Sequence, residues 1–142
     1  MKKYFNLILL ILWMLFIFVM SHNSAVSSSN QSSLITDFIS KIFRIEDIEV
    51  LEFIIRKIAH LFEYFVLGLL MINYFKKYNN INYLFVSMLL CIIYAFTDEI
   101  HQLFIPGRNG NIKDIFIDSI GSLVSVISYY LIYKNNVVKK LK

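Results

Sequence analysis

The sequence predicts an all-α integral membrane protein, a single domain over residues 1–142 that forms a four-helix transmembrane bundle. Apolar residues make up 58% of the chain and charged residues 17%, whereas soluble domains contain roughly 45–50% and 25%. Four apolar segments approach or exceed the about 20 helical residues that cross the hydrocarbon core of a bilayer. These helices are predicted at residues 4–20, 53–74, 82–103 and 115–133.

The distribution of charge predicts how the bundle sits in a membrane. Lysines without neighbouring acids occur at the N-terminus, at residues 76–77 and after residue 133. All ten acidic residues lie in or beside the two remaining loops. Under the positive-inside rule, both termini and the 76–77 turn are therefore cytoplasmic. Since topology accounts for the basic charges, no nucleic-acid partner is predicted.

The first apolar segment has two interpretations. Its apolar run is longer than a typical signal-peptide core, which favours a retained transmembrane helix. The alternative is a cleaved signal peptide, with Ala25 and Ser27 as small residues near the cleavage site. The second segment starts outside in either case. The lone Cys91 lies within the third segment, so no intramolecular disulfide can form.

Residues 21–52 are predicted to form an outer connection with two parts. Residues 21–33 contain seven serines and no charge, which indicates a flexible linker. Apolar residues then recur at helical spacings over residues 34–45, which predicts an amphipathic helix. This helix either lies in the plane of the membrane interface or packs as a connector on the ends of the transmembrane helices.

The third loop has clear turn chemistry. Residues 105–108 fit a type II turn, with Pro at the second position and Gly107 supplying a positive φ at the third. Asn111 can cap the last helix, with Asp114 three residues further on. We therefore expect a short, stiff loop that holds Arg108 over the gap between the third and fourth segments.

Each of the last three segments carries a polar stripe in its outer half. On the second it comprises Arg56, Lys57, His60, Glu63 and Tyr64; on the third, Asp98, Glu99, His101 and Gln102; on the fourth, Asp114, Asp118, Gly121, Ser125 and Ser128. Charged groups at membrane depth face the interior of a bundle or a wet cavity. The three stripes therefore predict one outward-opening polar pocket.

Acid–base chemistry or anion recognition fits this mixture best, because it combines histidine and carboxylates with fixed cations. The predicted acid–base residues are His60, Glu99, Asp114 and Asp118, of which the two aspartates orient the site. Glu63 is an alternative to Glu99 as a desolvated general base. The predicted anion-binding residues are Lys57, Tyr64, Gln102 and Arg108, with Arg56 and Lys113 as further cations. No Ser or Cys has an evident nucleophile arrangement, and the sequence identifies no cofactor.

Three alternatives stay open. The stripes can be a salt-bridged network that only fixes helix packing. A metal site would need three or four convergent ligands from His60, Glu63, Glu99, His101, Asp114 and Asp118, and no compact ligand motif is present. A proton-coupled transporter is disfavoured because the four short segments contain no evident repeat.

The ordered motifs of residues 56–125 resemble the VanZ-like family of bacterial membrane proteins. They are Lys57-x-x-His60-x-x-x-Tyr64, then Asp98-Glu99-x-His101-Gln102-x-Phe104-x-Pro106-Gly107-Arg108, then Asp114-x-x-x-Asp118-x-x-Gly121. The chain departs from the family at Asp118, where Asn is frequent, and at Ser125, where a second Gly is usual.

The resemblance implies a multi-pass protein of the bacterial plasma membrane that affects sensitivity to teicoplanin-type glycopeptide antibiotics. Its implied partner is an anionic lipid or lipid-linked envelope component at the outer leaflet, which the protein binds or modifies. The alternative is a non-catalytic membrane accessory that binds a partner and whose polar cluster is structural.

Overall fold

The structure is a computed structural model that describes residues 2–23, 35–44, 46–78, 82–108 and 110–140. It contains four long helices, α1 (Lys2–His22), α3 (Ile48–Phe75), α4 (Tyr83–Gln102) and α5 (Ile112–Lys140). A shorter helix covers residues 35–43, and the described ranges contain no strand. Each long helix includes a stretch that is long and apolar enough to cross a membrane. The predicted all-α fold with four transmembrane helices is therefore confirmed.

The helices extend beyond their predicted bounds. α3 begins at Ile48 rather than at residue 53, because the Asp47 side chain accepts a hydrogen bond from Val50 N at 3.1 Å and caps the helix. α5 runs from Ile112 to Lys140, past the predicted end at residue 133. Apolar composition marks the part of a helix that crosses the hydrocarbon, whereas capping and backbone hydrogen bonds set where the helix ends.

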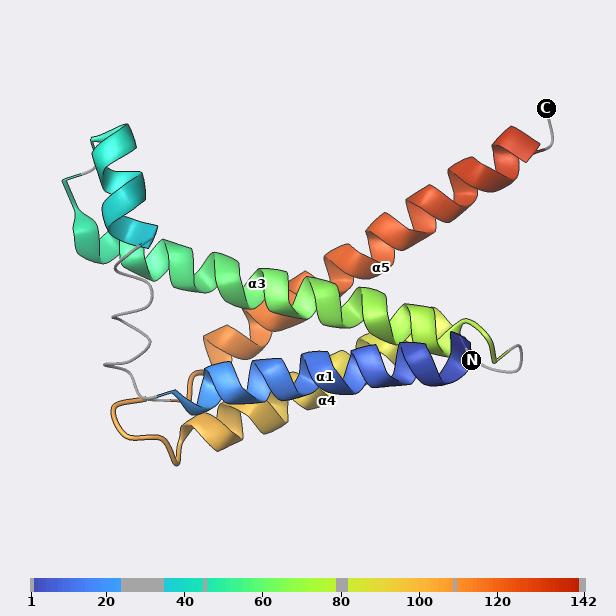
Figure 1. Ribbon diagram of the computed structural model, residues 1–142, viewed down its shortest axis with the longest axis horizontal. Helices are drawn as coiled ribbons and strands as arrows, with labels where there is room; N and C mark the ends of the chain where they lie inside the picture. Colours follow the sequence, from blue (N-terminus) through green and yellow to red (C-terminus); the bar gives the residue numbers. More distant parts are fainter. Residues whose placement is uncertain (1, 24–34, 45, 79–81, 109, 141–142) are drawn as a thin grey trace.

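Three helices run side by side and the fourth crosses them. In Figure 1, α1, α3 and α4 lie nearly parallel, while α5 crosses α3 obliquely and its C-terminal half extends away from the bundle. The N-terminus and the turn after α3 lie at one end of the bundle. The end of α1, the start of α3 and the α4–α5 loop lie at the other end, which we call the polar end. The side of the membrane that each end faces stays a prediction.

Small residues allow α3 and α5 to approach closely, and this pair makes the most extensive interhelical contact. A Cβ added at Gly121 of α5 would lie 2.3 Å from the carbonyl oxygen of Leu61 in α3. A Cβ at Gly68 of α3 would lie 2.9 Å from the Cβ of Ser125. Close backbone approach of this kind is the usual packing mode of membrane helices, which gain little from burying apolar surface away from lipid.

α1 is docked on the bundle through both apolar and polar contacts. Its Leu10 and Ile17 join the buried core formed with α3 and α4. The Trp13 indole donates a hydrogen bond to the Glu63 carbonyl at 3.0 Å, and the Tyr94 hydroxyl donates to the Met14 carbonyl at 2.7 Å. Whether the first segment is retained stays a prediction. The alternative cleavage site at Ala25 and Ser27 lies outside the described residues, as does the serine-rich linker from residue 24 onward.

The short helix over residues 35–43 lies near the start of α3 (Figure 1). More than half of the surface of each of four apolar residues in this helix is exposed: Ile35, Phe38, Ile42 and Phe43. Exposed apolar residues beside membrane-spanning helices are typical of a helix in the interface plane. Thr36 of the same helix is fully buried, so both the interfacial helix and the packed connector stay predictions.

Candidate functional site

The α4–α5 loop shapes the polar end of the bundle. Arg108 N donates to the Ile105 carbonyl at 3.1 Å, and Gly107 has a φ of 76°, as the predicted type II turn requires. The Asn111 side chain accepts a hydrogen bond from Lys113 N at 3.0 Å and so caps α5 as predicted. The turn at residues 105–108 directs Arg108 towards α1 and α3.

Two polar pockets adjoin at this end and share Arg56, His60 and Arg108. The first, of about 70 Å³, is lined by Met20, Ser21, Arg56, Ala59, His60, Glu63, Asp98 and Arg108. The second, of about 210 Å³, is lined by Phe53, Arg56, Lys57, His60, Gln102, Gly107, Arg108 and Asp114. The polar stripes of α3, α4 and α5 thus meet at one end, and α1 adds a wall.

Two charge pairs join α3 to α5. Lys57 forms an ion pair with Asp114, and His60 Nδ1 lies 3.3 Å from Asp118 Oδ1. Asp118 is fully buried, and neither of its carboxylate oxygens has a hydrogen-bond partner among the described residues. Burial of a carboxylate is costly unless a charge compensates it, so His60 is the group that balances Asp118 when its ring is protonated.

The ion pair bears on the role expected of Lys57. Its charge is already compensated by Asp114, so an anion would compete with this carboxylate, and its role as an anion contact stays a prediction. Arg56 lines both pockets, and its ion pair with Glu52 is long, at 3.8 Å, with both side chains partly exposed. The signal for Arg56 was present in the sequence, since it belongs to the same stripe.

Arg108 lies elsewhere than expected. Instead of spanning only the gap between α4 and α5, its guanidinium donates to the Asn23 carbonyl at 3.1 Å and to the Met20 carbonyl at 3.5 Å. It therefore binds the C-terminal end of α1, where a cation is favoured by the helix dipole. Burial and the nearby Arg56 lower the pKa of Arg108. An arginine stays charged at neutral pH even so, and two guanidinium groups face the same pockets.

The carboxylates of α4 point in different directions. Asp98 lines the first pocket and lies 3.5 Å from the Gln102 side-chain nitrogen, which donates to it. Glu99 accepts a hydrogen bond from Asn111 N at 2.7 Å and lines a separate, mainly apolar pocket near Leu103. Glu99 therefore ties α4 to the start of α5, and it lines neither of the pockets that His60 lines.

Glu63 lies beside His60 in the first pocket, together with Asp98. It belongs to the α3 stripe, and the sequence offered it beside Glu99 as a candidate general base. Its spacing of three residues from His60 was the available signal, because residues three apart share a helix face. The carboxylates that share a pocket with His60 are thus Glu63, Asp98 and Asp114.

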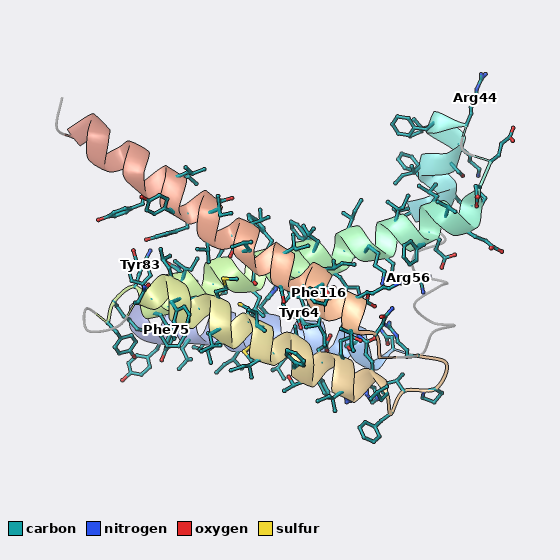
Figure 2. The ribbon with its side chains drawn as sticks, turned by 180° about the vertical axis from the view of Figure 1, so that it is seen from behind. Arg44, Arg56, Tyr64, Phe75, Tyr83 and Phe116 are labelled. Atoms are coloured by element: carbon teal, nitrogen blue, oxygen red, sulfur yellow. The ribbon has the colours of Figure 1, made fainter. Side chains whose placement is uncertain are left out.

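Tyr64 is fully buried near the centre of the bundle, whereas Arg56 lies nearer the start of α3 (Figure 2). The Tyr64 ring centroid is 6.3 Å from that of Tyr94, and its hydroxyl has no hydrogen-bond partner within the described ranges. Tyr64 lines neither polar pocket, so the structure places it in the core beneath the site.

His101 leaves the predicted polar face and packs against α1. Its Nε2 is 3.1 Å from the Nδ1 of His22, and its ring lies 4.6 Å from that of Phe18. In the part of the chain that the structure describes, no three His, Cys, Asp or Glu side chains are grouped as a three-ligand metal site requires.

The pockets have the groups to hold an anion and to exchange a proton with it. The two guanidinium groups can bind a phosphate or carboxylate, because each planar guanidinium can donate two parallel hydrogen bonds to such an anion. His60, Glu63 and Asp98 can donate or accept a proton within the same space.

Fold and site together define a multi-pass membrane protein whose transmembrane helices enclose a polar site at one end. The chain belongs to the VanZ family, because the family described as VanZ/LLP1 matches residues 5–133, nearly the whole chain. The comparisons with curated proteins and with solved structures found no match.

Proposed function

We propose that this VanZ-family protein acts at the outer leaflet of the bacterial plasma membrane, where it binds or modifies an anionic lipid or lipid-linked envelope component. Through this action it alters sensitivity to teicoplanin-type glycopeptides. The proposal rests on one observation. Arg56 and Arg108 converge on two adjoining pockets that also hold His60 and three carboxylates, those of Glu63, Asp98 and Asp114.

The two arginines select an anion. Like charges that share a pocket repel one another, and a bound phosphate or carboxylate removes this repulsion. The pockets lie at the end of the bundle that the positive-inside pattern assigns to the outside. A lipid whose tails stay in the bilayer would bring its headgroup to this depth, so an anionic headgroup is the ligand that fits both charge and position.

The acid–base groups extend the proposal from binding to modification. His60 contacts Asp118 on one side and shares the first pocket with Glu63 on the other. A histidine held in this way can move a proton to or from a bound headgroup near neutral pH. The reaction would then be a proton-assisted change at the headgroup, with the arginines holding the anion.

Purified protein and intact cells test the proposal together. Binding of short-chain phosphatidylglycerol to the detergent-solubilised protein is compared with binding of phosphatidylcholine of the same chain length, for wild type and for Arg56→Gln. Loss of one charge-assisted contact, worth about 1.5–3 kcal/mol, predicts a roughly tenfold to hundredfold loss of affinity. In cells, a deletion strain is complemented with the same variants, and teicoplanin susceptibility and membrane level are measured.

Lys113→Gln is the matched control, because Lys113 is an exposed cation near the same loop and lines neither pocket. We expect Lys113→Gln to behave as wild type in both assays, and Arg56→Gln to lose lipid binding and teicoplanin tolerance at normal membrane level. Equal behaviour of the two variants would refute a specific anion site.

A second candidate function is a non-catalytic membrane accessory in which the polar groups serve packing. It is favoured by the number of polar groups already joined across the bundle, as in Lys57 with Asp114 and Glu99 with Asn111. Membrane level separates the two. If Arg56→Gln and His60→Gln lose tolerance only together with membrane level, the polar groups serve packing; if Arg56→Gln abolishes tolerance at normal level and His60→Gln does not, the site binds without proton transfer.

A further inference from the structure

Two histidines face each other at the polar end, between the ends of α1 and α4. His22 is the last residue of α1, and His101 lies in the last turn of α4. His22 Nδ1 and His101 Nε2 are 3.1 Å apart, and the two ring planes differ by 19°. Neither ring lines the two polar pockets, so the pair is separate from the site proposed above.

We infer that His22 and His101 form a two-imidazole site for a divalent late transition-metal ion such as Cu²⁺ or Zn²⁺. With metal–nitrogen bonds of about 2.0–2.1 Å, adjacent nitrogens lie about 2.9 Å apart around a square-planar ion and about 3.3 Å apart around a tetrahedral one. The observed separation of 3.1 Å falls between these values.

The facing nitrogens are within hydrogen-bonding distance, so one neutral ring can donate to the other. A metal ion takes the place of the shared proton when the donor ring changes tautomer, so that its proton moves to its other ring nitrogen, and small rotations of both side chains direct the two lone pairs to one point. His22 is exposed and His101 is half-buried, so such rotations are not blocked by a closed core. The Phe18 ring packs on His101 at 4.6 Å and limits the range over which that ring can swing.

The surroundings favour a cation in one respect and oppose it in another. Both histidines lie at helix C-termini, where the ends of the helix dipoles are negative. Arg108 opposes binding, because its guanidinium is bound to the Met20 and Asn23 carbonyls at the same end of α1. Coordinate bonds to the two imidazoles must therefore supply the affinity. Water completes the coordination sphere, because among the described residues no third His, Cys, Asp or Glu lies close enough to act as a ligand.

Occupancy would link α1 to α4. α1 provides one wall of the first polar pocket through Met20 and Ser21, so an ion held one residue further along fixes that wall. The inference does not depend on the function proposed for the pocket, because it concerns only the two rings and the ion.

Copper binding tests the site in the full chain, purified in detergent with a tag that contains no histidine. One equivalent of Cu²⁺ is added, its electron paramagnetic resonance spectrum is recorded, and its affinity is measured by competition with a chromophoric chelator. The chain has three histidines in all, so each can be replaced in turn. The thiol of Cys91 is fully buried in the core and out of reach of added copper.

We expect wild type to bind one Cu²⁺ with nitrogen hyperfine structure from two imidazoles, and to unfold at a higher temperature when the ion is bound. His22→Gln and His101→Gln should each weaken binding at least tenfold and abolish the thermal shift. His60→Gln is the matched control, because His60 lies in the polar pockets, and it should bind copper as wild type does.

Circular dichroism with and without copper shows whether each variant is folded, and a double variant His22→Asn, His101→Asn provides a second test if either Gln variant is unstable. Equal affinity in all variants would mean adventitious surface binding and would overturn the inference. A one-nitrogen spectrum in wild type would also overturn it.

Discussion

Gly121→Ala should separate α3 from α5 and destabilise the whole bundle. The added Cβ would lie 2.3 Å from the Leu61 carbonyl oxygen and 3.2 Å from the Phe65 amide nitrogen. Because even the closest real Cβ contacts stay at or above 3.0 Å, one backbone must move by at least 0.7 Å, the difference between 3.0 and 2.3 Å. Neither partner atom belongs to a side chain, so no rotamer change can relieve the clash.

Overpacking of this kind costs about 1–3 kcal/mol, and we expect about 3 kcal/mol here because the obstacle is backbone. Part of the cost arises because two charge pairs join the same two helices, His60 with Asp118 and Lys57 with Asp114. Their distances increase when the helices separate. The free energy of unfolding is measured by titrating detergent-solubilised protein with sodium dodecyl sulfate and following circular dichroism.

Ile120→Ala is the control, since Ile120 is half-exposed on the lipid-facing side of the same helix turn. Lipid tails are as apolar as the side chain, so its truncation should change the free energy of unfolding by less than about 0.5 kcal/mol. If Gly121→Ala is as stable as Ile120→Ala, close contact between the two backbones does not hold this bundle together.

Two further predictions concern the same interface. Gly68→Ala places a Cβ 2.0 Å from the Ser125 hydroxyl, so we expect the free energy of unfolding to fall by about 1–2 kcal/mol. The loss should be smaller when Ser125 is also replaced by Gly. A double-mutant cycle that gives a coupling energy below about 0.5 kcal/mol contradicts this. Lys57→Met leaves the Asp114 charge without its partner and should lower the free energy of unfolding by about 1–3 kcal/mol at this partly buried position. The double variant Lys57→Met, Asp114→Leu should recover most of that loss in the same denaturation assay. If the double variant is no more stable than the single one, the ion pair is not the reason for the loss.

The sequence alone determined the transmembrane architecture, because crossing a bilayer requires only apolar length, and that is a local property of the chain. It also determined the turn at residues 105–108, since Pro fixes φ at one position and Gly107 permits a positive φ at the next. Helix ends were less well determined, because Asp47 caps α3 outside its apolar stretch.

The partners of the polar residues were decided only by the tertiary structure. A helical stripe shows which residues share a face, but the face is broad and the rotation of the neighbouring helix is set by the crossing of α3 and α5 at Gly121. That crossing pairs Lys57 with Asp114. The docking of α1 decided the rest, because it supplies backbone carbonyls for Arg108 and a histidine for His101. No spacing within a single helix contains this information, since it depends on how four separate surfaces meet.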